Sequence, residues 1–278
     1  MNSRFPARAV VGAALLIACM GPAFAALADS VELPSAEARE QMLHLLETQA
    51  LYRDRVDWND VRARLAAAGD DRVQQRRVLD EAATRSSRGH GRWISPSQQR
   101  ERSGRAQRLN AGQGAALAES PAVDARIGVL KVGPFVEDLQ RSEQERHDAR
   151  KAYALALQQR IVDLDDGTRC AWVVDAGSNG GGNMWPMLLG LLPLLQGTPD
   201  AQGALIGAFR SADGLQWWRQ GEGEVRQDGT QGLRSRQAAY RLRAGGAPVA
   251  VLIGARTASS GEAVALAFRG QAGSRSFG

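Results

Sequence analysis

The chain has 278 residues, of which 44% are hydrophobic and 23% charged, as expected for a globular protein with a substantial core. Its net charge of +5 is spread over stretches that mix arginine with glutamate, and this balance argues against a nucleic-acid partner. Arg4 and Arg8 belong to a segment that we expect to be removed, and without them the net charge falls to +3.

Residues 1–28 are typical of a secretory signal peptide. An apolar stretch at 10–20 is too short to span a bilayer, which takes about 20 residues, and an A-x-A cleavage signal follows at 23–25. A second interpretation stays open, because 16–19 reads Leu-Ile-Ala-Cys, the pattern of a lipoprotein signal with a lipid anchor at Cys19. Ordinary cleavage is favoured. Both interpretations predict a periplasmic or secreted protein, in the second case anchored to the membrane.

Residues 30–96 are predicted to form an N-terminal helical subdomain. Ser35, Asp57 and Asp71 are helix-start signals, each followed by apolar residues at helical spacing. In the first of these helices, Leu45 is expected on the buried face. Residues 97–122 are rich in Gln, Arg, Ser and Ala and lack periodicity, so we interpret them as a linker or mobile loop.

Strand-like and helix-like segments alternate over residues 123–278, which is typical of βαβ units in a parallel sheet. The expected fold class is therefore α/β, with this core following the helical subdomain. The apolar, β-branched runs predict strands at 126–132, 170–174, 204–209 and 249–253. The longer amphipathic or apolar runs predict helices at 142–161, 184–195 and 260–269. The turn-rich run predicts a hairpin at 215–229.

Two turns in this core carry candidate chemistry. Residues 175–183 read DAGSNGGGN after one apolar strand, and residues 256–262 read RTASSGE after another. Acyl transfer needs a nucleophile on a sharp turn between strand and helix, together with backbone N–H groups aimed at an oxyanion. Ser259 can supply the nucleophile and Gly180–Gly182 the backbone donors.

The two turns resemble the core motifs of the S41 family of serine peptidases, which includes tail-specific and carboxyl-terminal processing proteases and tricorn-like relatives. Residues 175–182 correspond to the family pattern D-L-R-x-N-x-G-G, and residues 257–262 to S-A-S-A-S-E. The resemblance covers roughly residues 126–278. It implies a ClpP/crotonase-like spiral of βαβ units and a catalytic Ser259. It also implies an oxyanion hole formed by the N–H groups of Gly181 or Gly182 and of Ser260, with no metal or cofactor.

The general base is the open point of this resemblance. The processing proteases carry a lysine in a run such as F-G-E-x-T-x-G-K, and this chain ends at Phe277-Gly278, where that run would begin. The tricorn-like branch uses a histidine before the core, and His90 lies in the corresponding turn. The base is therefore expected to be His90 or a lysine beyond Gly278. His44 and His147 are expected to be surface residues of charged helices.

Three departures from the family pattern affect the activity that the resemblance implies. Gly177 replaces the usual arginine of the first motif, and no segment before Arg126 is long enough for the PDZ domain that many members carry. The protease core is expected to be incomplete at its C-terminus, so weak or absent activity is predicted for these 278 residues. Cys170 stands alone once the signal is removed, and we expect it to be a small buried side chain.

The favoured function is a secreted serine-type peptidase that cleaves envelope or extracellular proteins, with a peptide or protein substrate as its partner. A second hypothesis is a catalytically inactive binding protein of the cell envelope with the same fold, prompted by the missing lysine and by Gly177. A crotonase-like acyl-CoA enzyme is a third hypothesis, and the signal peptide argues against it because coenzyme A is cytoplasmic.

Overall fold

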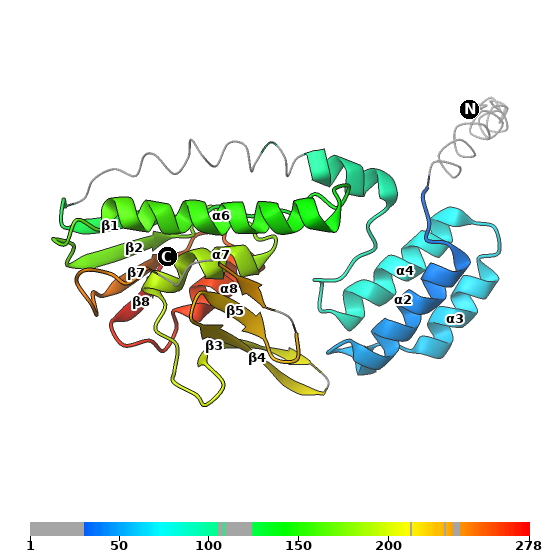
Figure 1. Ribbon diagram of the computed structural model, residues 1–278. Helices are drawn as coiled ribbons and strands as arrows, with labels where there is room; N and C mark the ends of the chain where they lie inside the picture. The colour runs from blue at the N-terminus through cyan, green and yellow to red at the C-terminus, as the bar shows by residue number, and fades with distance from the viewer. Residues whose placement is uncertain (1–30, 105–107, 109–123, 212, 231, 236–239) are drawn as a thin grey trace, which may run out of the picture. The chain divides into compact units, whose positions relative to one another are not determined.

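The computed structural model describes residues 31–104, 108, 124–211, 213–230, 232–235 and 240–278. The proposed signal peptide, its alternative anchor Cys19 and most of the proposed linker lie outside these residues. The chain divides into two compact units, one ending at Pro96 and the other beginning at Ser97, and each is described by itself (Figure 1).

In the described part of the N-terminal unit, residues 31–96, three α-helices begin at the predicted positions. Helix α2 (Ala36–Gln49) starts after Ser35, whose Oγ accepts a hydrogen bond from Ala38 N. Helices α3 (Trp58–Ala67) and α4 (Arg72–Ser86) start after aspartates at 57 and 71 whose carboxylates accept from first-turn amides, and the short 3-10 helix η1 (Arg53–Arg55) precedes α3. These caps confirm the predicted starts, because each satisfies N–H groups that lack a partner inside the helix.

The core of this unit corrects one expectation about α2. Leu43 is 2% exposed, whereas Leu45, which was expected on the buried face, is 44% exposed. Leu43 shares one buried cluster with apolar side chains of α4. The buried cluster comprises Leu43, Val56, Val61, Val78, Leu79 and Ala82.

The start of the segment predicted to be a linker or mobile loop is a helix and not a loop. Residues 96–104 are helical, and Ser103 is buried. Gln, Arg and Glu have good intrinsic helix propensity, so this stretch forms a helix although it lacks an apolar stripe. The prediction for residues 105–107 and 109–122 falls outside the described part of the chain.

The C-terminal unit contains a four-stranded parallel sheet, which lies below helix α6 (Glu143–Leu164) in Figure 1. Its strands lie in the order β1 (Ile127–Lys131), β2 (Ala171–Asp175), β7 (Val249–Leu252) and β8 (Ser274–Phe277). Strand β8 was not among the predicted strands, because its sequence Ser-Arg-Ser-Phe is polar and pairs as an edge strand with mostly exposed side chains.

Three helices pack with this sheet in one hydrophobic core. Helix α6 (Glu143–Leu164) begins with a capping box at Ser142, and α8 (Ser260–Ala267) follows β7. Helix α7 (Met184–Leu191), which leads into the 3-10 helix η2 (Leu192–Leu194), is buried on nearly all sides. A helix that is apolar all round belongs in the interior, and here α7 contacts α6 on one side and strands β5 and β6 on another.

A second, antiparallel sheet corrects the expected topology. Its order is β3 (Ala204–Ser211), β4 (Gly214–Gly221), β5 (Glu224–Gln227) and β6 (Leu233–Arg234). The segment 204–209 was predicted as part of an all-parallel alternation, but the short connection from β3 to β4 has no room for the crossover that a parallel pair requires. The fold is therefore mixed α/β with one parallel and one antiparallel sheet.

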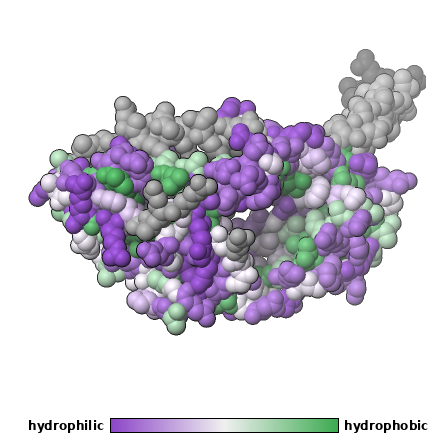
Figure 2. Space-filling view, in the orientation of Figure 1, coloured by the Kyte–Doolittle hydropathy of each residue, from purple (hydrophilic) through white to green (hydrophobic). Residues whose placement is uncertain are grey.

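The visible surface is mainly polar, with apolar side chains in small separate patches (Figure 2). Within the described residues, no helix has both the length and the apolar character needed to cross a bilayer.

Candidate active site

The two candidate loops meet because they follow neighbouring parallel strands. Strands β2 and β7 pair in register from Trp172–Val249 to Asp175–Leu252, so both end at the same edge of the sheet. The carboxyl edge of a parallel sheet is where α/β proteins commonly place their sites. We call residues 176–183 the glycine loop and residues 254–260 the serine loop.

Asn179 holds the glycine loop from inside. Its side chain is fully buried, its Oδ1 accepts from Gly181 N at 3.0 Å, and its Nδ2 donates to Gly133 O at 3.3 Å. Gly181 and Gly182 have φ values of +105° and +117°, a region that side-chain-bearing residues rarely adopt. The loop therefore depends on glycine at both positions.

A segment that precedes α6 lies directly against this loop. Phe135 forms an isolated parallel bridge with Gly182, and Phe135 O accepts from Asn183 N at 2.7 Å. A Cβ atom at Gly182 would lie only 1.9 Å from Phe135 O. The backbone at Phe135 thus leaves room for glycine alone at position 182.

Helix α6 supports the same segment through Tyr153. The Tyr153 hydroxyl donates to Gly133 O at 2.7 Å, and its ring packs edge-on against Phe135 with centroids 5.1 Å apart. Burial raises the pKa of Tyr153 because the phenolate would lose its hydration. Gly133 O accepts from both Tyr153 and Asn179, so α6 and the glycine loop share one anchor.

Ser259 occupies a strained position at the start of α8. Its φ and ψ are +53° and −120°, and only one other described non-glycine residue, Arg88, has a positive φ. Such a conformation costs on the order of 1–3 kcal/mol and persists only where neighbouring contacts impose it. Here the Glu262 carboxylate accepts from Ser259 N at 2.8 Å, and Thr257 Oγ1 donates to Ala176 O at 2.8 Å. Ser259 itself is exposed.

The serine loop and the glycine loop are in direct contact. Ala258 N donates to Asn179 O at 3.0 Å, and Ser260 Oγ donates to Gly182 O. A Cβ atom at Gly181 would lie 2.9 Å from Ser259 Cβ, so the backbone of the glycine loop passes directly beside the serine side chain. The structure thus brings together the two turns that the sequence singled out.

The candidate oxyanion donors differ in their availability. The Gly181 amide already donates to Asn179 Oδ1. Across the described parts of the chain, neither the Gly182 amide nor the Ser260 amide donates a hydrogen bond to another residue. Of the three residues proposed from sequence, Gly182 and Ser260 therefore retain N–H groups that could face a substrate oxygen, whereas Gly181 shapes the loop.

Of the three histidines, His44 and His90 belong to the N-terminal unit, and His147 belongs to the C-terminal unit together with Ser259. His90 is exposed and belongs to the N-terminal unit, so its role as base stays a prediction. His147 was expected to be a surface residue, but it is half-buried and lines a pocket beside α6. His44 is exposed on α2. Among the residues that the structure describes, no cluster of His, Cys, Asp or Glu is suited to hold a metal.

Cys170 is exposed, which corrects the expectation that it is buried. It lies just before β2, where its N–H donates to Arg126 O at 2.9 Å and its side chain is left outside the sheet. Its apolar neighbours in the sequence belong to the strand, whereas Cys170 lies in the irregular segment just before it.

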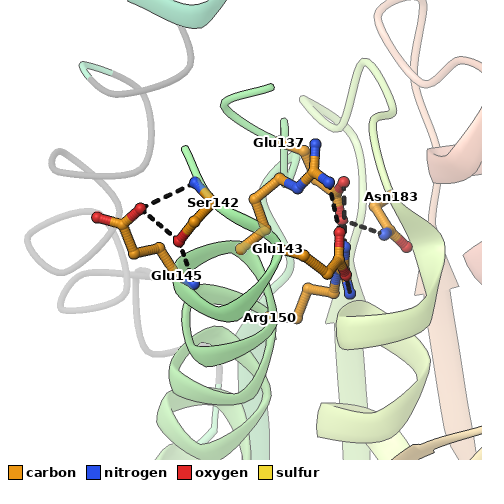
Figure 3. A network of polar contacts seen from close by, with 7 residues as sticks. Glu137, Ser142, Glu143, Glu145, Arg150 and Asn183 are labelled. Atoms are coloured by element: carbon orange, nitrogen blue, oxygen red, sulfur yellow. Dashed lines mark hydrogen bonds and ion pairs between the residues drawn. The ribbon is translucent and has the colours of Figure 1, made fainter. Parts of the chain in front are cut away.

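Sequence reasoning did not identify a polar network beside the glycine loop. Glu137 accepts from Asn183 Nδ2 at 2.7 Å and forms an ion pair with Arg150 of α6, which also contacts Glu143 at 3.0 Å (Figure 3). Asn183 Oδ1 caps α7 by accepting from Trp185 N at 2.9 Å. The available sequence signal was the asparagine at the end of the glycine run, immediately before an apolar helix.

Comparisons with known proteins give a fold likeness. No family model matches the chain, and no curated protein matches it. A lipoprotein from Streptococcus agalactiae has a similar solved structure, with a TM-score of 0.58 and 18% identity over 88% of this chain and 76% of that one. A candidate peptidase from Parabacteroides merdae aligns with a TM-score of 0.43 and 14% identity over 85% of this chain and 72% of that one. The likeness to the lipoprotein concerns the fold alone, and the function is argued from the site.

Proposed function

We propose that this protein is a secreted serine-type peptidase that cleaves peptide bonds in envelope or extracellular proteins. Ser259 is the nucleophile. The backbone N–H groups of Gly182 and Ser260 form the oxyanion hole. His90 is the proposed base. The proposal includes the ClpP/crotonase-like spiral of βαβ units as the fold, and the parallel order β1-β2-β7-β8 supports it.

The contact between the two loops carries the proposal. A methyl group on Gly181 would meet Ser259 Cβ at 2.9 Å, and the next amide in the glycine loop has no internal acceptor among the described residues. The strained backbone at Ser259 adds to this argument, since non-glycine residues in such conformations cluster at functional sites.

In the proposed reaction, Ser259 Oγ attacks the carbonyl carbon of the scissile bond while the base takes the hydroxyl proton. The carbonyl oxygen becomes an oxyanion that accepts from the Gly182 and Ser260 amides, and loss of one such donor typically costs about 10²–10³ in rate. The proton then passes to the leaving amine, and water hydrolyses the resulting acyl-enzyme.

Covalent labelling with a fluorophosphonate tests this proposal without a known substrate. We expect the probe to modify Ser259 in the wild-type protein, as seen by mass spectrometry of the peptide that contains it. Ser259→Ala should abolish the modification, and Ser276→Ala, a change at an exposed serine of β8, should leave it intact. Labelling that survives in Ser259→Ala would contradict the assignment of the nucleophile.

The rate of labelling tests the base. If His90 accepts the Ser259 proton, His90→Ala should slow modification by about 10²–10⁴-fold, while His44→Ala on α2 should not change it. An unchanged rate in His90→Ala would remove His90 from the proposed site and leave Ser259 assigned.

A catalytically inactive binding protein with this fold is the second candidate function. It is favoured by one specific observation. Within the described chain, the ionisable side chain that hydrogen-bonds Ser259 is Glu262, and it binds the backbone N–H group instead of activating the hydroxyl. A wild-type protein that folds and yet never reacts with the probe would support this function over the peptidase.

A further inference from the structure

A pocket of about 370 Å³ lies between α6, the start of α7 and the hairpin formed by β5 and β6. This volume falls in the range of pockets that bind small ligands or single large side chains. Its lining combines an apolar part with a polar part, and the residues that matter for the argument are Trp185, Val225, Leu233, His147, Asn183 and Thr230.

The apolar part of the lining is well fixed. Val225 and Leu233 belong to the hydrophobic core and are 0% and 8% exposed, and Trp185 packs against that core. The Trp185 ring meets Trp218 edge-on, with centroids 6.4 Å apart, which fixes its orientation. An incoming ring would therefore find a preformed aromatic partner, and offset or edge-on ring pairs are favourable contacts.

The charged side chains around the pocket are paired with one another. Arg150 forms ion pairs with Glu137 and Glu143, and Arg226 lies 3.8 Å from an oxygen of Asp228. The nearby Glu143 carboxylate is also paired with Arg146, and this arginine lowers the pKa of Glu143. Because these opposite charges balance, the surroundings favour an uncharged ligand group over a carboxylate or an ammonium group.

The pocket borders the glycine loop directly. Asn183, which lines it, follows Gly182 in the chain and donates to Glu137, the same carboxylate that pairs with Arg150 (Figure 3). One wall of the pocket is therefore built from the residues that fix the end of the proposed oxyanion loop. A peptide whose carbonyl oxygen reaches the Gly182 amide would have an adjacent side chain within reach of this pocket.

We propose that this pocket is a specificity pocket that takes a large, uncharged aromatic side chain of the peptide substrate close to the scissile bond. Its aromatic contact is Trp185, and Asn183 and Thr230 line its polar part. The inference rests on the proposed peptidase function for the identity of the ligand, and its test measures binding alone.

The test measures dissociation constants of blocked amino-acid amides by NMR titration of the full chain. N-acetyl-tyrosine amide should bind at least about tenfold more tightly than N-acetyl-alanine amide, since burying an aromatic side chain is worth about one to two decades in affinity. The indole signal of Trp185, assigned by a Trp185→Phe variant, should shift with tyrosine amide and stay in place with alanine amide.

Two variants fill the pocket from opposite walls, and a third serves as control. Thr230→Trp on the hairpin and His147→Trp on α6 should each weaken binding of the tyrosine amide at least about tenfold. Leu215→Trp, at a 53% exposed position on β4, should leave it unchanged. Circular dichroism establishes whether each variant is folded. The two filling variants change different walls of the pocket, so if one fails to fold, the other still tests the proposal.

The outcomes separate this inference from the proposed function. Equal affinities for tyrosine and alanine amides, or unaltered tyrosine-amide binding in a folded filling variant, would overturn the pocket assignment even if Ser259 reacts with a fluorophosphonate. Binding of p-cresol as tight as that of the tyrosine amide would overturn the peptide assignment, because the backbone would then contribute nothing. Tyrosine-amide binding by a chain whose Ser259 never reacts would uphold the pocket and contradict the peptidase.

Discussion

The glycine loop and the serine loop lie side by side, yet they are held in different ways. The glycine loop is locked by a buried asparagine and by backbone contact with Phe135. The serine loop is exposed, and a surface carboxylate and its contact with the glycine loop hold Ser259 in an unfavourable backbone conformation. We infer from this difference that the glycine loop supplies rigidly held backbone N–H donors and that the serine loop presents the reactive side chain of Ser259.

The strongest challenge to this division is Gly182→Ala. Its Cβ would lie 1.9 Å from Phe135 O at a φ of +117°, so the loop must move or the unit must lose stability by about 3 kcal/mol or more. Gly180→Ala is the matched control, since its Cβ would find its nearest atom, Arg256 O, at an ordinary 3.9 Å. Chemical denaturation measures both, and a Gly182→Ala protein as stable as wild type would refute the locked loop.

Asn179→Ala tests the interior anchor of the same loop. Removing the side chain leaves the buried Gly181 N–H group without its acceptor, which should cost about 1–3 kcal/mol of unfolding free energy. Ser178→Ala changes the neighbouring residue and should stay within about 0.5 kcal/mol of wild type. If the two variants unfold at the same denaturant concentration, Asn179 is not an anchor.

Tyr153→Phe tests the support that α6 gives to the locked loop, and it predicts a pH dependence. Burial places the pKa of Tyr153 above its unfolded value of about 10, so its stabilising effect is complete below pH 10 and is lost as the pH rises further. The variant should be less stable by about 1 kcal/mol at pH 7, because one hydrogen bond is lost. Its stability should also fall less steeply than that of wild type above pH 10, as followed by denaturation between pH 8 and 11. If the stabilities of wild type and Tyr153→Phe fell equally with rising pH, Tyr153 would not be the group that causes this pH dependence.

Ser259→Gly has the smallest expected effect, and its sign is opposite. Glycine adopts a φ of +53° without strain, so the substitution should raise the unfolding free energy by up to about 1 kcal/mol. Ser259→Ala keeps the Cβ atom and the strain, so its stability should resemble that of wild type. A decrease in stability for the glycine variant would show that the conformation of the serine loop is not strained.

Local signals in the sequence account for the helix starts and for the site motifs. Ser35, Asp57 and Asp71 were readable as caps because a cap depends on a few neighbouring residues, and the structure confirms the resulting helices. The pairing of a glycine-rich turn with Ser259 was likewise readable from two short patterns. Parallel strands explain why such distant turns meet, but the choice of neighbouring strands does not follow from either pattern.

The sequence alone thus determined an α/β chain, an N-terminal helical segment and the two turns of the candidate site, because caps, periodicity and glycine turns are local properties. Tertiary structure decided the rest, since contacts between distant segments are not encoded in any single window of sequence. It placed β3 in an antiparallel sheet and left Cys170 exposed. It also put Phe135 against Gly182, which explains why that position of the site must be glycine.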